Sequence, residues 1–376
     1  MKLSLSPYLS RKIHGVNILW FKNSNEYILL NDLNNSLLSS FITSKDYSEF
    51  YTSINLLDTF SNEISKKLYS EFEQLLISLH STPSLSTSSD LKDNSDSYFI
   101  TVFYNFNNLI IKVSYQSLFE KSIIHPQFSY LEDTSPNLKV DCTFSINSSE
   151  KEFHFFKNNT HKGTYKHSEY HLLQGRFAME LLCALTGSEE TDWLGTFHAS
   201  TISNNKEAVM LVGESGKGKS TLATILMANG YNLIADDFTP IMAKTQKIHH
   251  YPSAISMKTG SFHVLDTLLD KITFSYSTSS NIKKGNLKYV VPINNVEKPI
   301  TCKKIILVEY NPHAKSSLKE ISAEKILNIL IPDSWISPVP ENAEYFLNWL
   351  ETCNFYKLTY HDSEEVVLEF KNILKK

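Results

Sequence analysis

The residues AVMLVGESGKGKST, from Ala208 to Thr221, decide the fold of the central part of this chain. An apolar strand runs directly into Gly213, and after four intervening residues come Gly218, Lys219 and Ser220, which satisfies the pattern GxxxxGK[ST]. In such a loop, backbone amides wrap a phosphate chain, the lysine reaches the outer phosphates and the hydroxyl is available to Mg²⁺. The alternative interpretation is a glycine-rich turn that binds no ligand. The expected nucleotide-binding residues are Gly213, Glu214, Ser215, Gly216, Lys217, Gly218, Lys219, Ser220 and Thr221. Of these, Lys217 and Thr221 are expected to be bystanders or loop anchors rather than direct phosphate ligands.

Two consecutive aspartates follow the helix that this loop opens. The helix is expected to begin at Lys219 and to stop at Asn229 and Gly230, and the strand YNLIADD comes next and ends on Asp236 and Asp237. Open α/β sheets bind ligands at the carboxyl ends of their strands. Because successive strand residues face opposite ways, one carboxylate can act on an acceptor hydroxyl while the other holds the metal. We favour Asp236 as the base and Asp237, with Ser220, as the metal ligand, although the sequence leaves their order open; the alternative is an aspartate turn or helix cap.

The stretch GESGKGKSTLATILMANGYNLIADD resembles the kinase core of the HPr kinase/phosphorylase family, which shares a P-loop variant with phosphoenolpyruvate carboxykinases. The resemblance implies a P-loop core with a mixed sheet, ATP or another nucleoside triphosphate with Mg²⁺, and an aspartate that deprotonates a serine hydroxyl. It also implies that His198, in the segment FHAS, assists that aspartate and that Lys219 acts in catalysis. The segments 251–260 and 286–292 look like parts of shorter relatives from peptide-modification clusters. There Lys258 and Lys288 are candidate cations near the phosphates or the acceptor, or else ordinary surface lysines.

The chain departs from this family in its arginines. No acidic, arginine-containing signature follows the aspartate pair, and Arg11 and Arg176 are the two arginines of the whole sequence. The resemblance therefore does not extend to HPr as the acceptor or to phosphorolysis. Transition-state charge has to be met by Lys219, Mg²⁺, another lysine or a partner's residue.

The composition predicts two folded parts joined by a linker. Residues 1–80 resemble, through NILWFKNSNEYILLNDLNNSLLSSFI, the PqqD-like module, a small α+β winged-helix-like domain that captures a leader peptide by strand addition and in a helical groove. The alternative is a compact domain that serves only dimerisation or stability, and a homo-oligomer is one possibility that the sequence leaves open. Residues 81–97 are serine-rich and predict a linker. Residues 98–376 are expected to form the HPr kinase-like part, with a strand-rich section over 98–160 and the nucleotide-binding core over 161–376.

Local patterns predict individual elements of secondary structure. Strands are expected over 16–21, 26–30 and 304–310. Helices are expected over 58–80, 168–185, 323–330, 343–353 and 363–375. Two histidines, His167 and His171, lie four residues apart, a spacing that suits a metal, although surface histidines are the commoner explanation.

Charge and composition restrict the class of function. The formal net charge is −4, so no overall basic field favours nucleic acid or an anionic membrane. The chain has no apolar run of bilayer length and no signal-type core, and its four scattered cysteines suit free thiols, so we expect a cytoplasmic protein. The favoured function is an ATP- and Mg²⁺-dependent kinase acting on a serine or threonine hydroxyl of a peptide or small protein, such as a ribosomal peptide precursor. Alternatives are a nucleotide-binding scaffold that recognises a precursor without transferase activity, and a small-molecule kinase.

Overall fold

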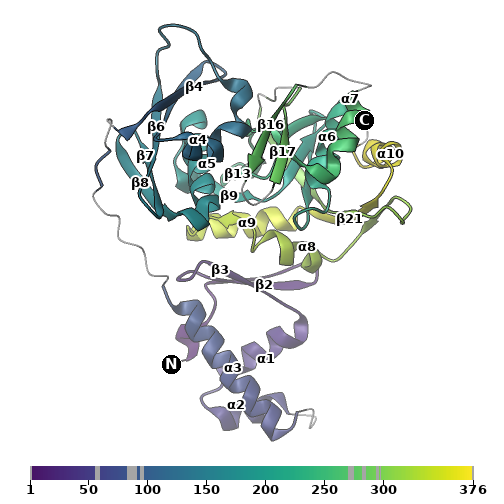
Figure 1. The fold of residues 1–376 in the computed structure, drawn as a ribbon. Coiled ribbons are helices and arrows are strands. Elements are labelled where there is room, and N and C mark those ends of the chain that lie inside the picture. The colour runs from purple at the N-terminus through teal and green to yellow at the C-terminus, as the bar shows by residue number, and fades with distance from the viewer. Residues whose placement is uncertain are drawn as a thin grey trace.

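The computed structural model describes residues 2–55, 60–82, 91–93, 97–269, 275–281, 285–293, 296 and 298–374. Its described strands form four sheets, and helices pack between and beside them, so the fold is mixed α/β as the sequence predicts (Figure 1). None of the described helices is both long enough and apolar enough to cross a bilayer. All four cysteines are buried free thiols.

The central sheet contains ten strands, eight of them in the order β12-β10-β11-β18-β14-β13-β9-β20, and β21 pairs with β18 and with β19. β11 pairs in parallel with β18, and β18 with β21, whereas the other neighbours are antiparallel. The bounds are β9 Trp193–Phe197, β10 Ser200–Ser203, β11 Ala208–Val212, β12 Asn232–Ala235, β13 Thr239–Met242, β14 Lys247–Ile248, β18 Ile300–Tyr310, β19 Ser317–Glu320, β20 Trp335–Ile336 and β21 Asn354–Tyr360.

Helices cover both faces of this sheet, and β11 is therefore buried on both sides. Met210 and Val212 pack into the cluster that contains α8 (Ala323–Leu330) and α9 (Pro340–Glu351). Val209 and Leu211 face the cluster of α6 (Lys219–Ala228) and α10 (Ser363–Ile373). The sequence of a strand buried on both faces is a continuous run of apolar residues, which is why apolar and polar residues do not alternate in AVMLV.

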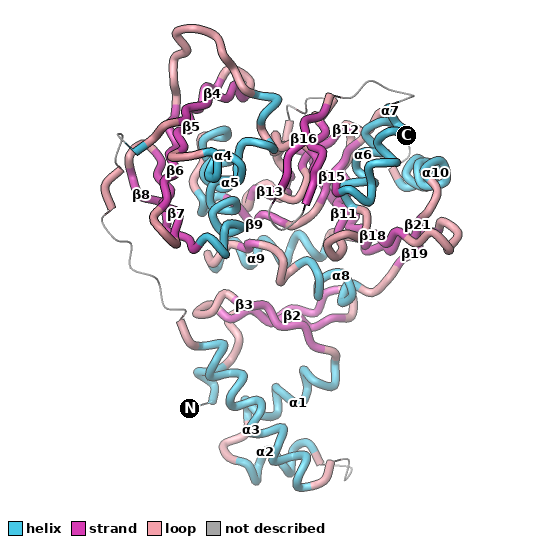
Figure 2. The backbone as a smooth tube through the Cα atoms, viewed as in Figure 1, coloured by secondary structure: helices cyan, strands magenta, loops and turns pink. Residues whose placement is uncertain are grey.

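A five-stranded sheet and a small three-stranded sheet flank the central sheet (Figure 2). The larger has the order β4-β5-β6-β7-β8, and α4 (Leu118–Ile124) and α5 (Tyr170–Thr186) pack in its core with Trp193 and Ala235 of the central sheet. The smaller has the order β15-β17-β16 and contacts α6. The remaining bounds are β4 Ile100–Phe106, β5 Leu109–Tyr115, β6 Cys142–Ser148, β7 Glu152–Lys157, β8 Thr160–Lys166, β15 Ile255–Lys258, β16 Tyr276–Asn281, β17 Gly285–Val290 and α7 Phe262–Leu269.

The N-terminal part is an antiparallel sheet followed by three helices. β1 (Leu9–Ile13), β2 (Val16–Phe21) and β3 (Glu26–Leu30) precede α1 (Asp32–Thr43), α2 (Tyr47–Ile54) and α3 (Asn62–His80). All six residues of β2 are buried, although its side chains alternate in direction. Leu19 and Phe21 pack against the helices of this module, whereas Val16 and Ile18 belong to the core of α8 and α9.

The N-terminal sheet is therefore shared with the rest of the chain, and Figure 1 shows β2 and β3 beneath α8 and α9. Tyr27 meets Phe346 of α9 edge to face, with ring centroids 5.1 Å apart. Arg11 hydrogen-bonds Asn348 and lies 3.7 Å from the carboxylate of Glu344. These contacts make the module part of one packed body.

Most of the elements predicted from local patterns are present. The strands over 16–21 and 26–30 and the helix over 323–330 have the expected bounds, and α5 ends at Gly187, whose φ of +62° is a left-handed C-cap. β18 is longer than expected because it starts at Ile300, and α9 starts earlier, with Pro340 in its first turn. The predicted helix over 58–80 is observed from Asn62, and residues 56–59, like 83–90 and 94–96 of the predicted linker, lie outside the described residues.

The shared core gives a testable prediction about cooperativity. Ile18→Ala should destabilise the whole chain by about 2–4 kcal/mol, because a buried Ile-to-Ala change leaves a cavity between the module and α9. Urea unfolding followed by tryptophan fluorescence and by circular dichroism should give one coincident transition, shifted to lower urea. Leu33→Ala is the control, since Leu33 is 59% exposed and its loss should change stability by less than about 0.5 kcal/mol. Two separate transitions in the Ile18 variant would contradict a shared core.

Candidate functional site

Three chain segments converge at one edge of the central sheet. β10 lies between β11 and β12 and is antiparallel to both, so β11 and β12 run in the same direction. Their carboxyl ends therefore meet the start of β10, at Ser200. The phosphate-binding loop leaves β11 at this edge, and the aspartate pair leaves β12 there.

The register of the sheet sets which residues face one another at this edge. Phe197 of β9 is paired with Thr239 of β13, and Thr201 of β10 with Ala235 of β12. Continuing the same antiparallel register across the intervening residues brings Ser200 opposite Asp236. His198 and the aspartate pair thus come together because two long antiparallel segments bend at the same point.

The loop from Gly213 to Gly218 has the backbone of a phosphate cradle. Gly216 and Gly218 have φ of +85° and +99°, a conformation that side chains disfavour. A Cβ at Gly218 would also lie 2.7 Å from the hydroxyl oxygen of Tyr360, and one at Gly213 would lie 3.0 Å from the carbonyl oxygen of Val308. The glycines are therefore required by backbone conformation and by close packing of the loop on β18 and β21.

Lys219 is folded back over this loop at the start of α6. Its ammonium donates to the carbonyl oxygen of Gly213 at 2.6 Å. Burial lowers the pKa of Lys219, and the negative charges of Asp237, Asp236 and Asp333 oppose that decrease. The lysine therefore sits between the loop that would hold phosphates and the carboxylates beside it.

Asp236 is buried beneath the start of α6. Its carboxylate accepts hydrogen bonds from the hydroxyls of Ser220, at 3.1 and 3.2 Å, and Ser200, at 2.5 Å, and from the amide of Ser256, at 3.3 Å. Burial, and secondly the negative charge of Asp237, raise the pKa of Asp236 to about 7, although the hydrogen bonds from Ser200, Ser220 and Ser256 oppose the increase. A carboxylate held this way is a poorly solvated anion next to the hydroxyl of the phosphate-binding loop.

Asp237 has a different environment although it is the next residue. Its φ is +59°, in the left-handed region that non-glycine residues seldom adopt, and its side chain is 35% exposed. The carboxylate lies 3.8 Å from Nε2 of His198. The sequence favours Asp236 as the base and Asp237 as the metal ligand. In the structure Asp236 contacts Ser220 and Asp237 contacts His198, a geometry that favours the opposite division.

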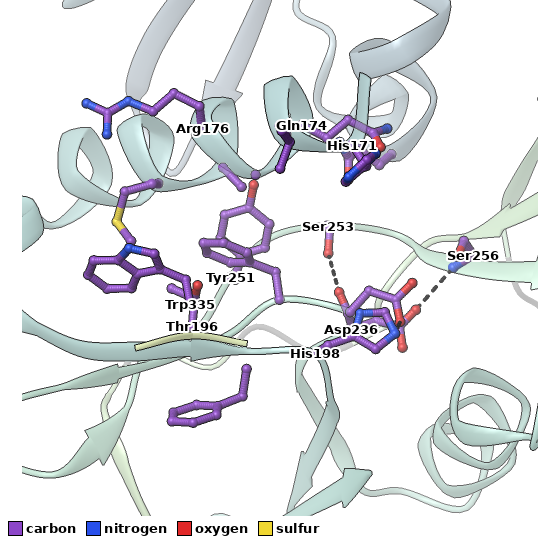
Figure 3. A pocket seen from close by; sticks show the side chains of 18 of the residues that line it. His171, Gln174, Arg176, Thr196, His198, Asp236, Tyr251, Ser253, Ser256 and Trp335 are labelled. Atoms are coloured by element: carbon purple, nitrogen blue, oxygen red, sulfur yellow. Dashed lines mark hydrogen bonds and ion pairs between the residues drawn. The ribbon is translucent and has the colours of Figure 1, made fainter. Parts of the chain in front are cut away.

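Two cavities meet at this pair of residues. One, of about 400 Å³, lies over the phosphate-binding loop and α6, and we call it the P-loop cavity. The other, of about 640 Å³, lies between α5 and the sheet edge that carries Thr196, His198 and Asp236 (Figure 3), and we call it the α5 cavity. His198, Asp237 and Ser256 line both cavities. Volumes of this size are typical of ligand sites.

The structure brings most of the predicted nucleotide contacts to the P-loop cavity. Of the nine, six line it: Ser215, Gly216, Gly218, Lys219, Ser220 and Thr221. Lys217 lies outside this lining, and its carbonyl oxygen accepts from the amide of Tyr310, as expected of a loop anchor. Thr221 also donates to the hydroxyl of Ser261 at 2.8 Å.

The two candidate lysines have different positions. Lys258 lines the P-loop cavity and donates to the hydroxyl of Ser215 at 2.8 Å. Lys288 lines neither cavity; it pairs with Asp266 at 3.0 Å and lies over the rings of Phe262 and Tyr276. These contacts give Lys288 a structural role on the small sheet.

Several lining residues escaped the sequence analysis because they come from distant segments. Tyr310 and Tyr360 line the P-loop cavity with their rings 5.5 Å apart, and Asp333 lines the α5 cavity. Arg176 also lines the α5 cavity, whereas Arg11 lies at the N-terminal interface. His171 lines this cavity as well, whereas His167 packs against Phe153, so they do not form a site together. In the sequence, only the P-loop motif indicates where the site lies. Asp333 stands alone in the segment IPDSW, and no pattern around it indicates a function.

The oxygen donors at Ser220 and Asp236 fit Mg²⁺ that arrives with a nucleotide. No cluster of three or more His, Cys, Asp or Glu side chains suited to a metal occurs among the described residues. Mg²⁺ in phosphate sites is commonly held by one or two protein oxygens, with substrate phosphates and water as the other ligands. A hydroxyl and a carboxylate in contact supply that donor set.

The burial of Asp236 predicts a pH-dependent stability. The pKa of Asp236 is about 7 in the folded chain, whereas the ordinary value for an aspartate is 3.8. Between pH 4 and pH 7 the folded state therefore keeps a proton that the unfolded state releases. The free energy of unfolding consequently falls as the pH rises from 4 to 7. Asp236→Asn should match the wild type near pH 4 and be more stable at pH 8, by up to about 4 kcal/mol. Urea unfolding at several pH values checks this, with Asp333→Asn as an exposed control. A variant less stable than the wild type at pH 8 would contradict the account.

Comparisons with known proteins add little to this geometry. No protein-family model matches the chain, and no curated protein matches it. Among solved structures, the HPr(Ser) kinase/phosphatase from Coxiella burnetii matches with 13% identity and a TM-score of 0.20, over 48% of this chain and 93% of that chain. A match at this TM-score carries no argument about fold or activity. The resemblances to the HPr kinase/phosphorylase family and to the PqqD-like module stay predictions.

Proposed function

We propose that this chain is a kinase that transfers the γ-phosphoryl group of ATP, with Mg²⁺, to a serine or threonine hydroxyl of a peptide or small protein. The observation that carries the proposal is the division of two adjacent carboxylates. Asp236 contacts the hydroxyl of the phosphate-binding loop, and Asp237 lies with His198 where the two cavities meet. A protein that only bound nucleotide would need the loop but would have no use for the second carboxylate.

The loop and its lysines supply the phosphate site. Amides of the glycine-rich loop and the positive end of α6 favour a phosphate chain. Lys219 can exchange its hydrogen bond to the Gly213 carbonyl for bonds to phosphate oxygens, because the Gly213 carbonyl belongs to the same loop that would bind the phosphates. Lys258, which lines the same cavity and donates to Ser215 of the loop, adds a second cation and partly takes the place of the arginine that many phosphoryl-transfer sites use.

Asp237 is the base in this proposal. Its carboxylate takes the proton of the acceptor hydroxyl as the acceptor oxygen bonds to the γ-phosphorus and the bond from that phosphorus to the bridging oxygen breaks, leaving ADP and a phosphoester. His198, 3.8 Å away, orients Asp237. Asp236 and Ser220 hold the metal, which when bound neutralises charge on the outer phosphates.

The N-terminal module supports the peptide part of the proposal. β3 is an outer strand of its sheet, and no described strand pairs with its free edge. An edge of this kind can accept an extended peptide as a further strand. Because β2 packs against α9, a peptide held on β3 would be fixed relative to the catalytic edge.

Asp237→Asn should abolish transfer and spare nucleotide binding. We expect the rate of phosphoryl transfer to fall by about 10²–10⁴-fold, the usual contribution of a general base, with the Kd for Mg·ATP within about threefold of wild type. Mass spectrometry of serine peptides incubated with Mg·ATP measures transfer through one added phosphoryl group, and a fluorescent ATP analogue measures binding. Asp266→Asn, a carboxylate that pairs with Lys288 outside both cavities, is the matched control.

Asp236→Asn separates the two assignments. If Asp236 serves the metal, this variant should weaken binding of Mg·ATP while leaving metal-free nucleotide binding near wild type. Loss of transfer in Asp236→Asn with full Mg·ATP affinity, together with normal turnover in Asp237→Asn, would restore the order favoured by the sequence. Absence of nucleotide binding by the wild type would refute the proposed function.

A further inference from the structure

We propose that the α5 cavity is the acceptor site and that it selects a serine- or threonine-bearing peptide segment whose neighbouring side chains are uncharged or cationic. This proposal rests on the proposed function, since Asp237 has to receive the acceptor hydroxyl. It goes further in assigning the acceptor to a particular cavity and in naming the chemistry of the segment.

The position of the α5 cavity suits an acceptor. It shares His198, Asp237 and Ser256 with the P-loop cavity, so a hydroxyl that enters from the α5 side meets Asp237 before it reaches the phosphate-binding loop. The P-loop cavity, by contrast, is lined by the loop itself and by Lys258. The two cavities therefore provide separate entries for donor and acceptor.

The two cavities also differ in charge. The P-loop cavity carries Lys219 and Lys258. The α5 cavity is lined by four carboxylates and one arginine, and that arginine, Arg176, is neutralised by Glu190 and Glu180, each at 2.6 Å. Of the other carboxylates, Asp236 is assigned to the metal and Asp237 to the acceptor hydroxyl, which leaves Asp333 to face the neighbouring side chains of the segment. An acidic segment would be repelled here, whereas a cationic one is complementary.

Aromatic side chains make up much of the remaining wall. These side chains offer apolar surface, and the faces of their rings attract cations. The aromatic residues of the lining are Tyr165, Phe197, Phe238, Tyr251, Tyr289 and Trp335. The hydroxyl of Tyr251 is buried and has no hydrogen-bond partner among the described residues. Figure 3 shows it directed toward α5, on the side of Gln174 and Arg176.

Gly175 keeps this cavity open. It lies in the interior of α5 and lines the cavity, where glycine is less favourable than alanine for the helix. A Cβ at this position would meet no other atom within 4 Å, so the packing of the chain does not require a glycine. The missing side chain leaves space that a bound segment can occupy.

Replacing Gly175 with residues that carry larger side chains tests the location of the acceptor. Gly175→Ala and Gly175→Leu should keep or raise the Tm, because both residues favour helix, and should leave the Kd for Mg·ATP unchanged. The KM for a serine peptide should rise about threefold with alanine and at least tenfold with leucine. Gly260→Ala is the reciprocal control: Gly260 also has open space around it but lines the P-loop cavity, so its change should alter nucleotide affinity and not the peptide KM.

Peptide charge tests the selectivity. Three peptides that are identical except for lysine, alanine or glutamate on both sides of one serine are phosphorylated by the full chain with Mg·ATP. The kcat/KM should be highest for lysine and about tenfold or more lower for glutamate than for alanine. Asp333→Lys should reduce the preference for lysine over glutamate by about tenfold, without a change in Tm.

The outcomes separate this proposal from the proposed function. Transfer with an unchanged peptide KM in Gly175→Leu, or a preference for glutamate, would overturn the acceptor assignment and leave the kinase assignment standing. Transfer to a small alcohol such as glycerol, but to none of the peptides, would overturn the peptide class. Failure to bind Mg·ATP would overturn the proposed function itself.

Discussion

The buried carboxylate of Asp236 constrains the whole site. It is desolvated between Ser200 of β10 and Ser220 of α6, and each of these bonds ties a different element to the end of β12. Burying an anion is unfavourable unless hydrogen bonds and charge compensate it. The three donors from Ser200, Ser220 and Ser256 compensate part of this cost, and a metal with its phosphates would compensate more. Without nucleotide, the charge of Asp236 is therefore only partly compensated, and the carboxylate either binds a proton or binds a cation.

The left-handed backbone at Asp237 gives the second carboxylate a separate role. Consecutive residues in a regular strand would place their side chains on opposite faces of the sheet. Here β12 ends at Ala235, and the turn directs one side chain beneath α6 and the other toward His198 and the two cavities. Cationic side chains then lie on the phosphate side and carboxylates on the α5 side. Local strain of this kind is typical of functional positions.

The sequence predicts the parts of this arrangement that are local. A continuous apolar strand, a glycine loop and a helix start are specified by neighbouring residues, and so is the position of the aspartates after the next strand. The order of the two carboxylates depends on the register between β10 and β12 and on one φ angle, neither of which a local pattern records. For the same reason Lys288 could not be separated from Lys258, since only the pairing of β17 turns Lys288 toward Asp266. The sharing of Ile18 with the core of α9 is a tertiary property and likewise escapes composition.

The most direct measurement is a crystal structure of the full chain with Mg²⁺ and a non-hydrolysable ATP analogue. The account predicts the triphosphate on the amides of the glycine loop, Lys219 moved from the Gly213 carbonyl to phosphate oxygens, Ser220 and Asp236 at the metal, and Asp237 facing the γ-phosphorus from the α5 cavity. A nucleotide bound elsewhere, or a loop that still holds Lys219 on Gly213 with Asp237 turned away from the γ-phosphate, would contradict it.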